Sequence, residues 1–226
     1  MQGFSEVFER RTTTDIVFDQ LLEEIVSLEI LPGAKLSEAD IAKRFGVSRQ
    51  PVRDAFNRLE AQDLLLIRPQ KATKVRGFSL LRIAHARFVR LAVELEVVRS
   101  ACLTWSAENT DTLGRNLEEQ AEAISTGNAE AFHGLDYKFH KLICELGGYP
   151  LAFNTIQECK QRIDRLCVLS LGRQSEAATL FSDHRELATA LTGGNVEAAT
   201  EVTRRHLGRL DETIAEIHIK HSDYFE

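Results

Sequence analysis

The chain has 226 residues, of which 43% are hydrophobic and 27% charged, so it carries enough apolar material for one large core or two small ones. No apolar run approaches the roughly 20 residues that a membrane-spanning helix needs, and the first residues lack the apolar core of a secretory signal. Four cysteines lie in apolar stretches without a Cys-x-x-Cys pair, which is typical of free thiols in a reducing compartment. We therefore expect a cytoplasmic protein without a membrane partner.

The net charge of −6 is unevenly distributed along the chain. Residues 78–226 contain 22 acidic and 16 basic residues, whereas residues 35–77 contain ten basic and five acidic residues. Phosphate binding depends on a local basic patch more than on the total charge. The early segment therefore remains a candidate for nucleic-acid binding.

The first 77 residues predict a winged helix-turn-helix over residues 12–77, after a flexible arm over 1–11. Apolar residues recur at helical spacing from Thr14 to Ile30. A second helix follows Ser37 and ends at Phe45, Gly46 makes the turn, and a third helix runs from Ser48 to Gln62. Two β-prone stretches, 64–68 and 73–77, then form a hairpin with the basic tip Pro69-Gln70-Lys71.

The third helix has a core face and a polar face. Its apolar stripe comprises Val52, Ala55, Phe56 and Leu59. The adjoining face can enter a major groove, where Arg pairs with guanine and Asn or Gln with adenine. The predicted DNA-binding residues are Arg44, Ser48, Arg49, Gln50, Arg53, Asn57, Lys71 and Lys74. The alternative is a surface helix with ordinary solvated charges.

Several motifs in this segment carry a family resemblance. Leu31-Pro32-Gly33, Phe45-Gly46-Val47-Ser48-Arg49, Pro51-Val52-Arg53 and Arg58-Leu59-Glu60-Ala61 closely resemble the DNA-binding domain of GntR-type bacterial transcription regulators. The resemblance implies that Arg49 and Arg53 contact operator DNA and that the hairpin tip enters the minor groove. Many members have a glycine where this chain has Gln70.

From Ser79 onward the pattern predicts only helices, which gives a mainly α fold with an antiparallel six-helix bundle over residues 79–222. Glycines and polar N-caps separate the helices. The predicted ranges are 79–107, 111–125, 128–146, 150–171, 176–191 and 195–218.

Three of these helices direct ionisable groups inward. His184 and His206 each lie in the middle of an apolar stripe, and Asp136 and His140 are i,i+4 neighbours beside a third stripe. Buried polar groups need one another, water or a cation. Three imidazoles and a carboxylate suit a divalent cation such as Zn²⁺, Ni²⁺, Mn²⁺ or Fe²⁺. The alternative is a set of hydrogen-bonded core histidines, and His133 is a possible substitute ligand.

This second segment also resembles a known domain. Arg90-x-x-x-Glu94, Arg99-Ser100-Ala101, Asp136-x-x-Phe139-His140, Asp183-His184 and His206-Leu207 look like the helical effector-binding (FCD) domain of the FadR branch, VanR-like subgroup. The resemblance implies that Asp136, His140, His184 and His206 bind the metal and that a small carboxylate completes its shell. Arg90 is then either an effector-binding counter-ion or an i,i+4 partner of Glu94.

The expected function is a ligand-responsive, DNA-binding transcription regulator that is not an enzyme. Two apolar faces on the helix 79–107 suggest a homodimer, with two winged domains reading the half-sites of a double-stranded operator. The resemblance implies a repressor, and a small organic acid would shift the population of states so that the two winged domains no longer match the operator spacing. The rivals are a metal-sensing regulator and a metal-dependent hydrolase. For the hydrolase no nucleophile or general base stands out in the sequence, although Asp164 and Glu94 could approach the cluster.

Overall fold

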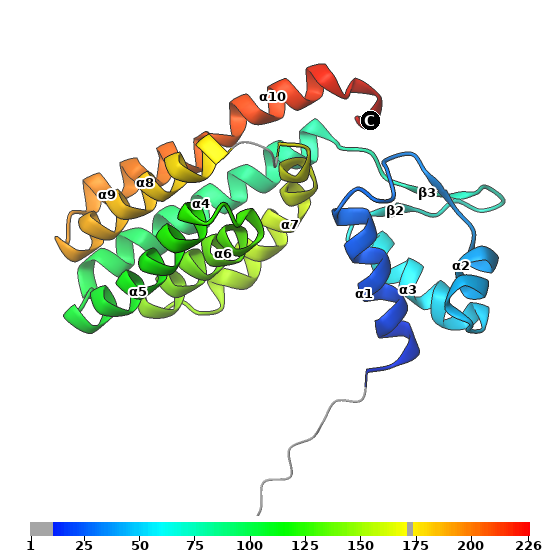
Figure 1. Cartoon of the computed structure of the whole chain (residues 1–226), viewed down its shortest axis with the longest axis horizontal. Coiled ribbons are helices and arrows are strands. Elements are labelled where there is room, and N and C mark those ends of the chain that lie inside the picture. The colour runs from blue at the N-terminus through cyan, green and yellow to red at the C-terminus, as the bar shows by residue number, and fades with distance from the viewer. Residues whose placement is uncertain (1–10, 171–173) are drawn as a thin grey trace, which may run out of the picture. The chain divides into compact units, whose positions relative to one another are not determined.

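The computed structural model describes residues 11–170 and 174–226, so the predicted N-terminal arm lies almost wholly outside the described residues. The described chain is mainly helical and forms two compact units (Figure 1). The first comprises Met1–Ser79 together with Asp223–Glu226, and the second comprises Leu80–Ser222. No described helix is long and apolar enough to cross a membrane.

The first unit is a winged helix-turn-helix. Its elements are α1 (Thr13–Val26), β1 (Lys35–Leu36), α2 (Glu38–Phe45), α3 (Arg49–Ala61), β2 (Leu65–Leu66) and β3 (Thr73–Val75). A capping box between Thr12 and Asp15 begins α1. Gly46, at a φ of 66°, ends α2 in the left-handed region and makes the turn into α3.

Two predictions about this unit need correction. The helix predicted over 14–30 ends at Val26, because Leu28 turns into the left-handed region at a φ of 63° and Ile30 donates back to the Glu24 carbonyl. The predicted hairpin is part of a three-stranded antiparallel sheet in the order β1-β3-β2. Leu65 pairs with Val75 and Lys35 with Lys74. The two-residue strand β1 is too short to show an alternating pattern in the sequence.

The core of the first unit lies where the sequence placed it. Val52, Ala55, Phe56 and Leu59 are each 0% exposed, and they pack with Leu21 and Ile25 of α1. The C-terminal residues close this unit from the other end of the chain. The amide of Glu226 donates to the Phe78 carbonyl, and the rings of Phe78 and Phe225 lie 5.4 Å apart.

The second unit is a helical bundle with α4 in contact with most of its other helices. Its elements are α4 (Leu80–Thr104), α5 (Ala107–Ser125), α6 (Ala129–Leu146), α7 (Ala152–Ser170), α8 (Gln174–Thr192), α9 (Val196–Gly208) and α10 (Leu210–Lys220). A short 3₁₀ turn at Ser222–Tyr224 follows and leads into the C-terminal residues of the first unit. Arg209 divides the helix predicted over 195–218 into α9 and α10. If these two are counted as one helix, the bundle has the six helices that the sequence predicted. Ser106 caps α5, one turn before the predicted start.

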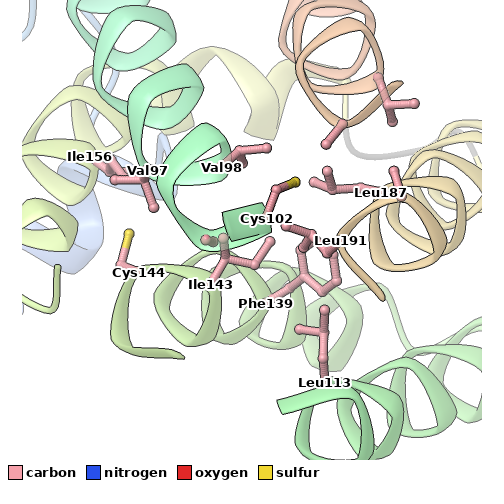
Figure 2. Packing of buried hydrophobic residues seen from close by; sticks show 14 of the residues in the cluster. Val97, Val98, Cys102, Leu113, Phe139, Ile143, Cys144, Ile156, Leu187 and Leu191 are labelled. Carbon is pink, nitrogen blue, oxygen red and sulfur yellow. The ribbon is translucent and has the colours of Figure 1, made fainter. Parts of the chain in front are cut away.

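The apolar core of the bundle is shared by α4, α5, α6, α7, α8 and α9 (Figure 2). Phe139 is completely buried and lies near Leu113 and Leu191 in this core. Cys102, Cys144 and Cys159 are buried free thiols, as predicted. Phe139 also stacks on the ring of His184, with centroids 4.1 Å apart. The core therefore continues directly into a polar cluster.

Candidate DNA-binding surface and metal centre

All eight predicted DNA-binding residues lie on the surface of the first unit. Four of them stand on or next to α3, and their side chains face away from the apolar stripe that packs on α1. Arg44 and Ser48 flank the turn, and Lys71 and Lys74 stand on the wing. Because all eight side chains are exposed, a large ligand such as a DNA duplex can reach them.

Acidic neighbours hold three of these side chains in the DNA-free chain. Arg53 makes a forked pair with Glu38, with nitrogen–oxygen distances of 3.3 and 3.0 Å. Gln50 donates to Asp54 at 2.9 Å, and Arg44 donates to Glu24 at 3.0 Å. The Gln50 and Arg53 contacts are exposed and therefore weak, whereas Glu24, the partner of Arg44, is buried. DNA phosphates or base edges can therefore displace the two exposed contacts.

The backbone explains two details of this surface. Ser48 is at the N-cap position of α3 with extended backbone, but its side chain makes no capping hydrogen bond. Ser48 therefore occupies the predicted N-cap position, but its side chain does not cap the helix. At the wing tip Gln70 adopts a φ of 59°, the left-handed region that favours glycine.

In the second unit, the four predicted metal ligands converge. Asp136 and His140 come from α6, His184 from α8 and His206 from α9, and all four are buried. Each offers a ligand atom, and these four atoms lie within 4.8 Å of one another. His133 is outside the cluster and makes an edge contact with Tyr137, so it is not a substitute ligand in this arrangement.

The outer ring nitrogens of the three histidines face oxygen acceptors. The Nδ1 of His140 lies 2.7 Å from Glu94, and the Nδ1 of His184 lies 2.8 Å from Gln120. The Nδ1 of His206 lies 3.6 Å from Asp183, within ion-pair distance but without a hydrogen bond. Hydrogen-bonded outer partners such as those of His140 and His184 orient metal-binding histidines and leave Nε2 for the metal.

The carboxylate of Asp136 is divided between two environments. Its Oδ1 lies 3.4 Å from the Nε2 of His184 and 3.7 Å from the Nε2 of His140. Its Oδ2 accepts a hydrogen bond from the ammonium of Lys160, which also lies 4.3 Å from the ring centre of Tyr137. One oxygen therefore faces the imidazoles while a buried cation from α7 compensates the charge.

The environment sets protonation states that suit metal ligands. Burial lowers the pKa values of both His184 and His206 below the ordinary value. Burial acts against ionisation of Asp136 too, but the Lys160 charge holds the pKa of that carboxyl well below its ordinary value. Two neutral imidazoles and a carboxylate are forms that coordinate metals directly.

His140 has a different balance. Burial lowers the pKa of this imidazole, but the negative charges of Glu94 and Asp136 outweigh burial and raise the pKa overall. A cation bound beside Asp136 would replace the proton as the positive partner.

The residues present fit a divalent cation. The donor set is three imidazoles and one carboxylate, which suits Zn²⁺ and its first-row neighbours. The Nε2 of His184 is buried without a hydrogen-bond partner, and an unpaired buried nitrogen is costly unless it binds something.

Arg90 lies at the edge of this cluster. It pairs with Glu94, which was one of the two roles predicted for it. Its Nε donates to Glu94 at 2.6 Å, and its Nη2 lies 3.3 Å from the Nε2 of His140. Both members of the Arg90–Glu94 pair are buried. The guanidinium is thus an internal charge beside the predicted metal ligands, a position from which it can also meet an anion.

Sequence reasoning missed three buried polar residues around the ligands, Asn116, Gln120 and Lys160, and it did not predict the contact of Asp183 with His206. Asp183 is 1% exposed and accepts from Arg205 and Arg209, so two basic side chains hold it beside His206. A signal was present for the others. Gln120 follows Leu113 and Asn116 at helical spacing, and Lys160 falls between Ile156 and Ile163 on one stripe. The side chain of Asp164, a candidate base, lies outside the described residues.

Comparison with known families divides the chain in the same way. A family model described as bacterial regulatory proteins, gntR family, matches residues 13–75. A model described as the FCD domain matches residues 86–209, more than half of the chain.

Curated relatives match over almost the whole length. The HTH-type transcriptional repressor RspR of Escherichia coli is 32% identical over 209 residues, which cover 92% of each chain. An HTH-type regulator from an unstable DNA locus of Streptomyces ambofaciens is 31% identical, covering 95% of this chain and 90% of its own.

Solved structures share the fold. Escherichia coli McbR/YncC superposes with a TM-score of 0.70 at 20% identity and covers 93% of this chain and 99% of its own. A transcriptional regulator GntR from Rhodococcus sp. RHA1 gives a TM-score of 0.71 at 22% identity, over 90% and 97% of the two chains.

Proposed function

The chain belongs to the GntR family of bacterial transcriptional regulators and carries an FCD domain, and from this premise we propose that it is a metal-binding repressor whose DNA binding is relieved by a small organic acid. Its function is regulatory rather than enzymatic, like that of its relatives. The regulator acts where its operator lies, which is the bacterial cytoplasm.

The observation that supports the metal role is the convergence of Asp136, His140, His184 and His206 within 4.8 Å inside the bundle. These residues would hold a divalent ion such as Zn²⁺, Ni²⁺, Mn²⁺ or Fe²⁺. When bound, such an ion supplies a positive centre that accepts anionic oxygen donors. Arg90, at the edge of the cluster, would add a second positive charge toward a carboxylate.

On the DNA side, we propose that α3 enters the major groove. Arg49, Gln50, Arg53 and Asn57 would read base edges, and Arg44, Ser48, Lys71 and Lys74 would contact phosphates or the minor groove. Arg53 would exchange its carboxylate partner Glu38 for a guanine, since a forked guanidinium fits both.

A homodimer would present two such helices to the half-sites of an operator. Phe88 on α4 is 71% exposed in the single chain, and Leu91 and Leu95 follow it at helical spacing. An apolar row that is left partly exposed in this way favours a covering partner. Phe88→Glu should convert the dimer to a monomer in sedimentation at micromolar concentration, whereas the exposed control Lys141→Glu should leave it a dimer. A wild-type monomer would contradict the proposal.

The central experiment separates the effector-responsive repressor from the metal sensor. Metal-free protein is loaded with one divalent metal at a time, and its affinity is measured for a DNA site selected by the protein from a random library. We expect metal to stabilise the fold with a modest change in DNA affinity, and a small carboxylate to weaken DNA binding only in the metal-loaded form. A full switch by metal alone would support the metal sensor instead.

A further inference from the structure

Two buried side-chain amides connect the ligand His184 to the backbone of another helix. Asn116 and Gln120 stand one turn apart on α5 and are 1% and 0% exposed. Neither is a metal ligand or can become charged. Their hydrogen bonds form a continuous chain from α6 through α5 to α8.

The direction of this chain follows from the chemistry of its first member. The Leu135 carbonyl can only accept, so the group that faces it at 3.2 Å is the Nδ2 amide of Asn116. The Oδ1 of Asn116 therefore points to Gln120 and accepts from its Nε2 at 2.7 Å.

The next link fixes the imidazole. With its Nε2 used toward Asn116, Gln120 presents Oε1 to the Nδ1 of His184 at 2.8 Å. A carbonyl oxygen requires a proton on that ring nitrogen. A neutral imidazole carries one N–H, so its Nε2 must hold a lone pair, and this is the buried nitrogen without a hydrogen-bond partner.

The reverse arrangement is unfavourable at only one point. If both amides were flipped, Gln120 would donate to the Nδ1 of His184. The imidazole proton would then lie on Nε2, and a protonated Nε2 cannot bind a metal. Asn116 and Gln120 would still be paired with each other. The flip would place the Oδ1 of Asn116 against the Leu135 carbonyl, and two acceptors cannot share a hydrogen bond.

We infer that Asn116 and Gln120 are positioning residues that fix His184 in its metal-binding tautomer, with the backbone carbonyl of Leu135 as the reference. This inference rests on the proposed metal site. The other two histidines face carboxylates, Glu94 and Asp183, at their outer nitrogens. His184 alone of the three relies on neutral amides, whose orientation has to be set by a further contact.

The test compares two replacements of Gln120 that differ in the acceptor. Gln120→Glu keeps an oxygen against Nδ1 and should bind Zn²⁺ within about threefold of wild type. Gln120→Leu removes the acceptor and should weaken Zn²⁺ binding by about 10- to 100-fold, the usual cost of losing an outer partner. Affinities are measured by competition with a chelator.

A second readout works in the metal-free protein. Nitrogen-15 NMR of the histidine rings should show His184 protonated on Nδ1 in wild type and in Gln120→Glu. In Gln120→Leu the proton should move to Nε2, from which it can reach Asp136. Asn116→Leu, which frees Gln120 to rotate, should give both forms, whereas Asn116→Asp, protonated toward the Leu135 carbonyl and accepting from Gln120 with its other oxygen, should keep the proton on Nδ1.

The outcomes separate the two proposals. A wild-type His184 protonated on Nε2, or equal Zn²⁺ affinities for Gln120→Leu and Gln120→Glu, would overturn the inference. A wild-type protein with the expected tautomer but no Zn²⁺ binding would overturn the metal site and leave the role of the amide chain intact.

Discussion

The two units place their functional residues in opposite ways. In the first unit the core is almost wholly apolar, and the predicted DNA contacts are all exposed. In the second unit the predicted metal ligands are themselves buried, next to Phe139 and other core residues. A duplex is too large to enclose and must be read from a surface, whereas an ion can be surrounded by side chains. The first unit should therefore tolerate changes at its site without loss of stability, and the second should not.

The largest expected effect is loss of the metal from the second unit. Replacement of His184 and His206 together by Ala removes two of four ligands and should abolish stoichiometric metal in the purified protein, measured by elemental analysis. His133→Ala, on the same helix as His140 but outside the cluster, should retain the metal. Metal retained by the double variant would point to other ligands.

Lys160→Met tests whether a residue beside the metal ligands also stabilises the fold of the second unit. The change leaves Asp136 buried without its cation, and breaking a buried pair costs about 3–5 kcal/mol. We expect a loss of this order in the free energy of unfolding of the metal-free protein, measured with urea. Lys138→Met breaks the exposed pair with Glu119 and should cost less than about 1 kcal/mol. Similar losses in both variants would contradict the burial argument.

Arg53→Ala is the corresponding test in the first unit. Loss of a guanine contact should weaken specific DNA binding by about 1–3 kcal/mol, roughly 5- to 150-fold. The unfolding free energy should stay almost unchanged, because the Arg53–Glu38 pair is exposed. Arg115→Ala, on the surface of α5, serves as the charge-matched control. Unchanged DNA affinity for Arg53→Ala would remove the groove assignment.

The smallest effect concerns acid stability at the start of α1. Hydrogen bonds from Thr12, with the Arg58 partner, lower the pKa of Asp15 from 3.8 to about 2. A lowered carboxyl pKa contributes stability that is present above pH 3.8 and is lost as the pH falls toward 2. Hydrogen-exchange protection of the α1 amides, measured relative to the intrinsic exchange rate at each pH, should fall over that range in wild type. In Asp15→Asn the protection should already be lower at pH 6 and change less on acidification.

The amino-acid sequence by itself determined the order and type of nearly all elements and the surface of the first unit. Caps, turn residues and a 3.6-residue period are local signals, so Ser37, Gly46 and the stripe through Phe56 were sufficient to place α2 and α3. Local signals also indicated the four ligands of the second unit, because His184 and His206 interrupt apolar stripes while Asp136 and His140 lie beside a third stripe. They could not show β1, whose two residues pair only with a distant strand.

Only the tertiary structure decided which buried polar groups meet. Lys160 lies 24 residues from Asp136, and Gln120 lies 64 residues from His184. Their partners depend on which helix faces are packed together, which no spacing within one helix encodes. The same packing fixes the direction of the amide chain from Leu135, since hydrogen-bond donors and acceptors on three helices become matched only when those helices lie in contact.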